Sequence, residues 1–167
     1  MTHVLAVDVG GTKTLFELSD ANGQVTHKLK LDSQRFDTFD AILTAFIEQL
    51  PQSCVINIAC VALAGPVSGQ YGQVTKLPWK LDARVIEKQF SIERVILCND
   101  FEAVGYGIAG LADSEVETLQ AGEPNQSYPR VVLGAGTGLG QAILIPQENQ
   151  WQVFATEGGH VDFAPLD

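Results

Sequence analysis

The stretch VLAVDVGGT, residues 4–12, decides the fold. Its first six residues, Val4–Val9, are almost all apolar, which is typical of a strand buried in the middle of a sheet. Gly10 and Gly11 interrupt the run, and an apolar strand resumes over Thr14–Ser19. Paired glycines allow a tight turn that other residues resist. The chain therefore begins with a strand, a glycine turn and a returning antiparallel strand.

Hydropathy patterns predict the elements beyond this opening. Asp20–Gly23 favours a hairpin turn that leads into a third, alternating strand at 24–31. Apolar residues at helical spacing then predict a helix that begins at an Asp37 N-cap and ends at Pro51. Further strands are expected over 54–64, 94–98, 131–133, 141–145 and 151–155, and further helices over 82–90 and 100–111. The predicted fold class is mixed α/β, in which an antiparallel hairpin leads a parallel part.

A later stretch repeats the opening pattern. VLAVDVGGTKTLFEL (4–18) and VVLGAGTGLGQAILI (131–145) both give an apolar strand, a Gly-Thr turn and an apolar strand, and a third strand follows each. Residues 112–129 between them are polar and rich in turn formers. The echo has two explanations, an internal duplication or the chance recurrence of glycine-rich turns, and the matching third strand favours duplication. We expect a small N-terminal α/β domain at 1–110 and the beginning of a second domain at 111–167.

Charge excludes some classes of partner. The 167 residues carry a net charge of −10. Residues 95–167 contain ten Asp and Glu residues and a single Lys or Arg, Arg130. Such a chain is unsuited to nucleic acid, and its second part would have to bind an anion through backbone amides and a metal. There is no apolar run long enough to span a membrane and no signal peptide. Three cysteines in apolar runs indicate reduced thiols and a cytoplasmic location.

The first motif with chemical meaning is Asp8 followed by the Gly10-Gly11-Thr12 turn. Exposed amides and the Thr12 hydroxyl can donate to phosphate oxygens. Asp8, at a strand end, can hold a hydrated Mg²⁺ ion. An ordinary hairpin turn with an incidental aspartate is the alternative.

The second motif is the run GAGTGLG at 134–140. No Gly-Lys-Ser/Thr follows it, so it is not a Walker loop. Leu139 and the strand that follows exclude the dinucleotide fingerprint. A second phosphate-binding turn centred on Gly136, Thr137 and Gly138 remains, with a flexible hairpin as the alternative.

Two further motifs supply polar side chains. Asn99 and Asp100 follow an apolar strand, where ligands bind in open α/β sheets; Asp100 can equally serve as a helix N-cap. Glu157 and His160 flank two glycines and suit the hydroxyls of a polyol. The alternative is that Glu157–His160 is a structural loop, in which the histidine bonds to a partner in the core.

Taken together and in this order, the motifs resemble those of the bacterial glucokinase family, within the sugar kinase, actin and Hsp70 superfamily. The matching stretches are DVGGT (8–12), LAGPVSG (63–69), TKLPW (75–79), NDFEAVGYG (99–107), GAGTGLG (134–140) and EGGHVDFAP (157–165). The resemblance implies a ribonuclease-H-like (actin-like ATPase) mixed sheet with flanking helices, followed by the start of a second copy.

The resemblance also implies an activity, ATP-dependent phosphorylation of glucose at its 6-hydroxyl. Asp100 would be the catalytic base, and Asn99, Asp100, Glu157 and His160 would bind the sugar. ATP and Mg²⁺ would meet the two glycine turns, at Asp8, Gly10, Gly11, Thr12, Gly136, Thr137 and Gly138, with Asp8 as the metal ligand. Lys13 and Lys76 stand where many relatives have Asn, which bears on specificity.

The resemblance further implies a protein about twice this length, so we interpret the chain as an N-terminal part that is inactive alone. The unpaired strand edge after residue 130 leads us to expect a homodimer. Two rival interpretations are another hexose or N-acyl-hexosamine kinase of the superfamily and a non-catalytic sugar-binding regulator.

Overall fold

The computed structural model describes residues 2–123, 125, 127–136, 138–148 and 150–162. The chain forms two compact units, Met1–Asp100 and Phe101–Asp167, and each is described by itself. None of the helices in these described ranges has the length and hydropathy that a membrane span requires.

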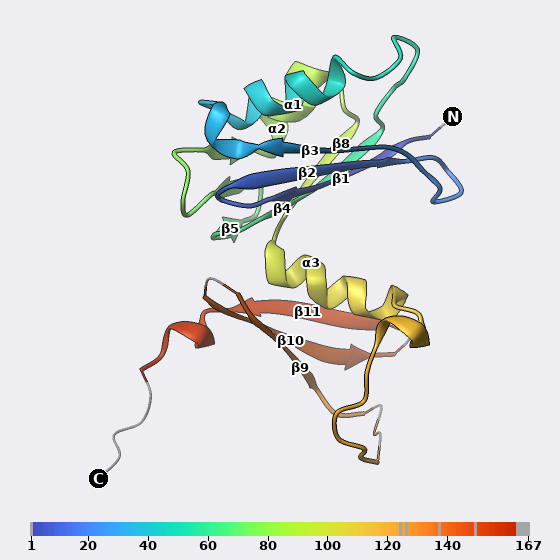
Figure 1. The fold of residues 1–167 in the computed structure, drawn as a ribbon, viewed down its shortest axis with the longest axis vertical. Coiled ribbons are helices and arrows are strands. Elements are labelled where there is room, and N and C mark those ends of the chain that lie inside the picture. Colours follow the sequence, from blue (N-terminus) through green and yellow to red (C-terminus); the bar gives the residue numbers. More distant parts are fainter. Residues whose placement is uncertain (1, 124, 126, 137, 149, 163–167) are drawn as a thin grey trace. The chain divides into compact units, whose positions relative to one another are not determined.

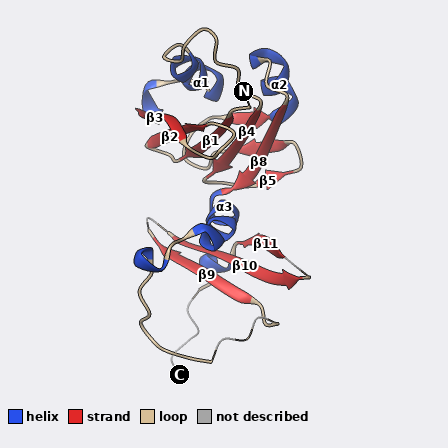
Figure 2. Ribbon diagram, turned by 90° about the vertical axis from the view of Figure 1, so that its right-hand side faces the viewer, coloured by secondary structure: helices blue, strands red, loops and turns tan. Residues whose placement is uncertain are grey.

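The first unit is built on a five-stranded mixed sheet in the order β3-β2-β1-β4-β8 (Figures 1 and 2). Strands β1, β2 and β3 pair antiparallel, whereas β1, β4 and β8 run parallel. This is the predicted arrangement of an antiparallel hairpin that leads a parallel part. The strands are β1 (Val4–Val9), β2 (Lys13–Ser19), β3 (Val25–Asp32), β4 (Ile58–Leu63) and β8 (Arg94–Asn99).

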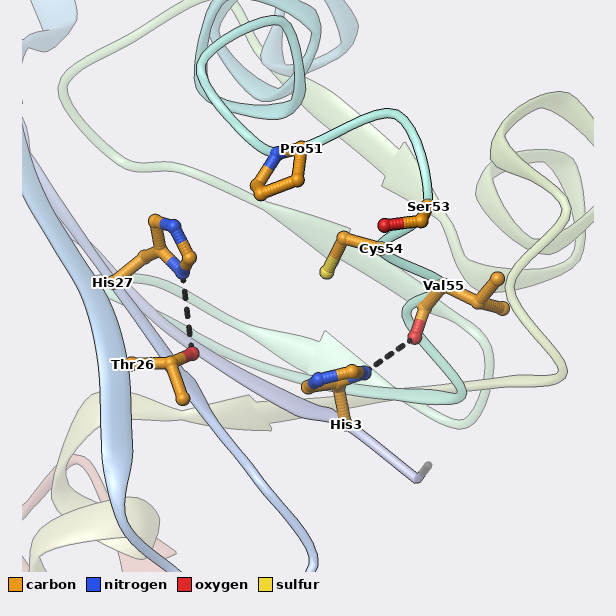
Figure 3. A pocket seen from close by; sticks show the side chains of 7 residues that line it. All are labelled: His3, Thr26, His27, Pro51, Ser53, Cys54 and Val55. Carbon is orange, nitrogen blue, oxygen red and sulfur yellow. Dashed lines mark hydrogen bonds between the residues drawn. The ribbon is translucent and has the colours of Figure 1, made fainter.

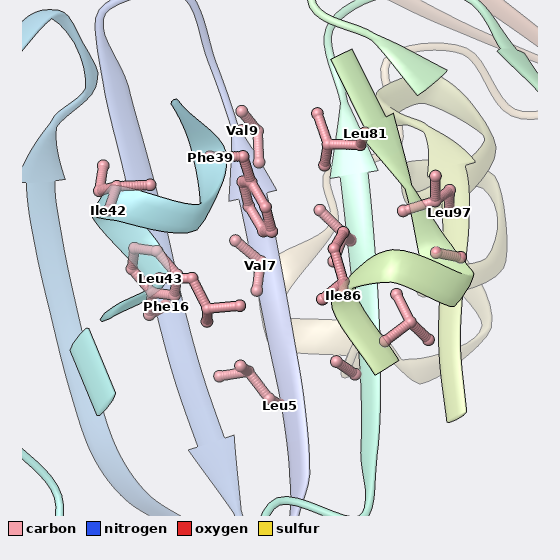
Figure 4. Close-up of a cluster of buried hydrophobic side chains, with 14 of the residues drawn as sticks. Leu5, Val7, Val9, Phe16, Phe39, Ile42, Leu43, Leu81, Ile86 and Leu97 are labelled. Carbon is pink, nitrogen blue, oxygen red and sulfur yellow. The ribbon is translucent and has the colours of Figure 1, made fainter. Parts of the chain in front are cut away.

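Two helices, α1 (Phe39–Ile47) and α2 (Ala83–Phe90), cover one face of this sheet (Figure 1). Every second residue of β1 faces them and is buried, which is the alternation expected of a strand. Figure 4 shows Val7 of β1 among the apolar side chains that the helices contribute. Phe16 and Phe46 stack at 4.7 Å between ring centroids and join β2 to α1.

The helix caps test the predicted boundaries. Asp82 accepts a hydrogen bond from the Arg84 amide at 3.0 Å and caps α2, which lies within the predicted range 82–90. The predicted Asp37 cap of α1 is wrong. Thr38 occupies the cap position, and its hydroxyl accepts from the Ala41 amide at 3.1 Å. The two neighbouring residues are both good capping types, and the helix begins at Phe39, so the position before it belongs to Thr38, whose backbone is extended.

A small antiparallel sheet follows β4 in the first unit. It consists of β5 (Val67–Ser68), β6 (Tyr71–Gln73) and β7 (Lys80–Asp82), in that order. Trp79 lies between β6 and β7 and is almost completely buried, and its indole N–H donates to the Phe36 carbonyl at 3.3 Å. The small sheet therefore carries the TKLPW stretch into the core.

The second unit contains α3 (Asp100–Gly107) from Phe101 onward and the antiparallel sheet β11-β10-β9 (Figure 1). The strands are β9 (Arg130–Ala135), β10 (Leu139–Gln147) and β11 (Gln150–Thr156). Their order repeats that of β3-β2-β1, with a glycine turn between the first two strands in both units. The start of a second copy, expected from the sequence echo, is therefore present.

The compact units divide ten residues before the domain boundary that we expected at 110. Helix α3 packs against the sheet of the second unit, where Gly105 contacts Val153 of β11. A Cβ atom at Gly105 would come within 2.5 Å of Val153 Cγ1. The domain boundary of a longer protein stays a prediction.

Candidate functional site

The carboxyl ends of three parallel strands meet at one edge of the first unit. Val9, Leu63 and Asn99 stand side by side in the registers of β1, β4 and β8. The residues that follow them therefore begin at the same edge, where ligands bind in open α/β sheets. The structure thus brings the glycine turn after β1 and the Asn99–Asp100 pair at the end of β8 to the same edge.

The glycine turn is closed by a hydrogen bond from the Gly10 amide to the Lys13 carbonyl, at 3.0 Å. The amides of Gly11 and Thr12 make no hydrogen bond to another residue in the described part of the chain. They are available as donors to an anion, which suits the predicted phosphate contact.

Gly11 must be glycine because another residue lies on it. A Cβ atom there would come within 2.7 Å of Lys76 Cβ, and the Lys76 stem continues along the same position. Lys76 is exposed and, within the described residues, makes no ion pair closer than 4.0 Å. The sequence singled out Lys76 only as a departure from the family's pattern and did not predict this contact with the turn.

Asp8 lies close enough to Asp100 for the two carboxylates to repel. Although Asp8 remains partly exposed, desolvation raises the pKa of its carboxyl, and the negative charge of Asp100 raises it further. Lys30 acts in the opposite sense on the same pKa. Two repelling carboxylates at a strand edge are a setting that a cation would stabilise.

This pair fits a magnesium ion bound with substrate. Mg²⁺ takes one or two carboxylates and fills its other positions with water and phosphate oxygens. In the described residues, no three His, Cys, Asp or Glu side chains gather in a way that could hold a metal ion. Asp8 and Asp100 are the carboxylates at this edge that would hold such an ion.

Asn99 is tied to the neighbouring strand. Its side-chain amide donates to the carbonyl of Gly65, just beyond β4, at 3.2 Å. The bond links the LAGPVSG stretch to the strand end that carries Asp100. Asp100 is the first residue of α3, one position after the N-cap position that the capping alternative gave it.

The second glycine turn separates its glycines by role. Gly134 and Gly140 lie against the ring of Phe101, where a Cβ atom at either position would collide. Gly136 and Gly138 have no such neighbour and no positive φ angle, and the Gly136 amide donates to the Gly138 carbonyl at 2.9 Å. The outer pair thus has a packing reason, whereas close approach of a ligand is left to the inner pair. Thr137, also predicted here, lies outside the described residues.

Glu157 and His160 meet each other in the second unit. A short 3₁₀ turn, Gly158–His160, brings the His160 Nδ1 atom to 2.9 Å from a Glu157 carboxylate oxygen. Both side chains are largely exposed, at 75% and 80%. The sequence placed them as separate sugar ligands and did not predict that they pair.

The described cavity of about 410 Å³ lies at the opposite end of the first unit's strands (Figure 3). Its lining includes His3, just before β1, and Val55, before β4. His27 and Cys54 also face it, and His3 Nδ1 lies 3.1 Å from the Val55 carbonyl oxygen. None of the predicted site residues is part of this lining.

Two buried hydroxyls beneath the first glycine turn escaped the sequence analysis. Thr14 and Ser33 are 19 residues apart and bond to each other at 2.9 Å. Thr14 reads as an ordinary strand residue and Ser33 as part of a loop, so no pattern in the sequence links them.

Comparison with known proteins decides the family. The sequence profile described as glucokinase matches residues 5–167. The chain belongs to the glucokinase family. The glucokinase of Trichormus variabilis is 43% identical over 169 aligned residues, which cover 99% of this chain and 49% of that protein. The chain thus spans about half the length of the curated relatives it matches.

Solved structures agree on the fold. A glucokinase from an Antarctic psychrotroph superposes with a TM-score of 0.81 at 27% identity, over 99% of this chain and 53% of that one. The Balamuthia mandrillaris glucokinase in complex with glucose gives a TM-score of 0.73 at 26% identity, over 99% and 50%. The predicted actin-like sugar kinase fold is confirmed.

Proposed function

We propose that the protein to which this chain belongs is a glucokinase, which transfers the γ-phosphoryl group of ATP to the 6-hydroxyl of glucose. One observation carries the proposal. In this member of the glucokinase family, Asp8 and Asp100 share one sheet edge with a turn whose Gly11 and Thr12 amides have no partner among the described residues. Phosphoryl transfer asks mainly for such positioning and charge.

Each predicted residue takes one role in this reaction. Asp100 accepts the proton of the attacking hydroxyl, which raises its nucleophilicity. Asn99, Glu157 and His160 bind the sugar hydroxyls, since a buried polyol needs every hydroxyl paired. Asp8 would hold Mg²⁺, which when bound would neutralise phosphate charge. The nucleotide meets Gly10, Gly11, Thr12, Gly136, Thr137 and Gly138.

Glucose as the substrate is supported by the bound sugar named for the Balamuthia relative. Another hexose or an N-acyl-hexosamine is the closest alternative. An acetamido group would call for an apolar pocket, whereas Glu157 and His160 offer a carboxylate and an imidazole. The activity would belong to cytoplasmic glycolysis.

The decisive experiment is Asp100→Asn in the complete protein, assayed for hexose-dependent ADP release. We expect kcat to fall by ~10²–10⁴-fold while glucose binding largely survives, because the amide fills the same space but cannot accept the proton. Asp113→Asn is the matched control, since Asp113 is an exposed acid on a separate 3₁₀ turn. Near-normal turnover of the Asp100 variant would overturn its role as the base.

The sugar contacts are tested by Glu157→Gln and His160→Ala. Loss of one partner of a buried hydroxyl costs ~1–3 kcal/mol, so the KM for glucose should rise ~5–150-fold with a smaller effect on the KM for ATP. Unchanged glucose dependence in both variants would leave their ion pair a structural feature of the loop.

A further inference from the structure

Thr14 and Ser33 are the two polar side chains that the core buries completely within the described residues, each with 0% of its surface exposed. Burial of a hydroxyl costs free energy unless it is hydrogen-bonded. Valine and alanine would fill these positions without needing partners, and the neighbouring inward residues of β2, Phe16 and Leu18, are apolar. The buried hydroxyls therefore need a reason beyond filling space.

Their hydrogen bonds lead to the first glycine turn. The Ser33 hydroxyl donates to the Gly10 carbonyl at 3.0 Å, and the Ser33 amide donates to the Thr12 carbonyl at 2.9 Å. A hydroxyl has one proton to give. Because the Ser33 proton goes to Gly10, the 2.9 Å contact between the two hydroxyls must be donated by Thr14. The order is Thr14 to Ser33 to Gly10.

Ser33 thus holds the turn at two carbonyls on either side of Gly11. A peptide plane is rigid, so fixing the Gly10 carbonyl orients the Gly11 amide, which belongs to the same plane. That amide and the Thr12 amide are the donors without a partner in the described part of the chain. The hydroxyls lie out of reach of solvent, so the orientation is kept without competition from water.

We propose that Ser33, oriented by Thr14, is a positioning residue that holds the Gly10–Thr12 turn in the conformation that binds the nucleotide phosphates. This inference rests on the proposed function. Ser33 itself touches no phosphate; it acts through the backbone of the turn.

The test compares Ser33→Ala and Thr14→Val in the complete protein. We expect Ser33→Ala to raise the KM for ATP about tenfold or more and to change the KM for glucose less than about twofold. Thr14→Val should raise the KM for ATP by a smaller factor than Ser33→Ala, because Ser33 keeps its hydrogen bond to the Gly10 carbonyl. The double variant should be no worse than Ser33→Ala alone, because the two hydroxyls act in series. Thr14→Ser, which keeps the donor, should restore the wild-type KM.

The matched control is Thr26→Val. The Thr26 hydroxyl donates to the Leu18 carbonyl at 3.1 Å, a bond of the same kind at the opposite end of the same strand pair. Its loss should leave both Michaelis constants unchanged. If Ser33→Ala fails to fold, Thr14→Val and Thr14→Ser still decide the question.

Direct binding separates the two proposals. Affinity for a non-hydrolysable ATP analogue should fall in Ser33→Ala by the same factor as the KM rises. If the wild-type protein binds the analogue but phosphorylates no hexose, the proposed function fails and this inference is still decided by the affinity. A lower melting temperature with unchanged nucleotide affinity, or equal effects on both substrates, would overturn it, as would a wild-type protein that binds no nucleotide.

Discussion

At Asp8 the fold keeps a carboxylate in a setting that opposes its charge. Desolvation and the nearby Asp100 both raise its pKa above the ordinary value of 3.8. Between 3.8 and the raised value, the folded chain binds more protons than the unfolded chain. The free energy of unfolding therefore falls as pH rises through that window and stays lower above it. The charged Asp8 carboxylate therefore lowers the free energy of unfolding. Such a cost is common at sites where a bound ligand supplies the opposite charge.

Asp8→Asn should therefore stabilise the chain at pH 7, and in the complete protein the same change should abolish metal-dependent turnover. The gain in melting temperature should be larger at pH 7 than at pH 3.5. At pH 3.5 the wild-type carboxyl is mostly protonated and therefore neutral, like the amide of the variant. Asp20→Asn is the control of opposite sign, because backbone amides of Gln24 and Asn22 lower the pKa of Asp20. It should lose stability at pH 7. An Asp8 variant less stable than wild type at pH 7 would contradict this account.

Residues at strand ends could be predicted from the sequence, and contacts beneath them could not. Asp8 and Asp100 each follow an apolar run, and parallel pairing brings such ends to one edge. The Ser33 contact with Gly10 joins a loop to a turn 23 residues away, and neither side shows a periodic pattern. Long-range polar contacts of this kind leave no mark on hydropathy.

At the scale of the element, two substitutions at the start of α1 measure how much its N-cap contributes to the free energy of unfolding. Thr38→Ala removes the hydroxyl that accepts from the Ala41 amide, so it should lower the free energy of unfolding by about 1 kcal/mol. Asp37→Ala should change it by less than about 0.5 kcal/mol, since Asp37 does not cap the helix. Urea denaturation of the two variants at pH 7 checks this; equal losses would indicate that both residues cap.

Element length decides what the hydropathy pattern can predict. The long strands β1 and β10 show clear runs and were predicted close to their observed positions. The small sheet β5-β6-β7 was missed because strands of two or three residues are too short to show alternation. Strand β4 begins at Ile58 rather than Cys54, because the Cys54 amide closes a turn onto the Pro51 carbonyl at 2.8 Å.

At the scale of the whole molecule, we predict that the 167-residue chain is catalytically silent by itself. It spans about half of the curated glucokinases it matches, so half of the family's residues are not in it. In-line transfer is sensitive to placement, and a shift of about 1 Å can cost ~10²-fold in rate. Glucose-dependent ADP release by the chain and by the complete protein, measured side by side, checks this. Comparable turnover would show that the remaining half is dispensable.

The same chain should self-associate. The face of the β11-β10-β9 sheet away from α3 carries an apolar row, with Val131, Ile143 and Phe154 exposed by 62%, 38% and 42%. Strand β9 also leaves one edge unpaired in the described sheet. Light scattering should report a dimer at high concentration, and Val131→Lys should shift it towards monomer. Val85→Lys, at an exposed valine on α2, is the control; a monomeric wild-type chain would refute the pairing.

The ring of Phe101 also constrains how this family can vary. It occupies the space that a side chain at Gly134 or Gly140 would need, on two neighbouring strands. A mutation of either glycine would push the ring and, through one peptide bond, the Asp100 backbone. Over evolution the three positions should therefore change together. Homologues that acquire a larger residue at position 134 or 140 should carry a smaller one at 101, and a glycine lost alone should be found only where catalysis is lost too.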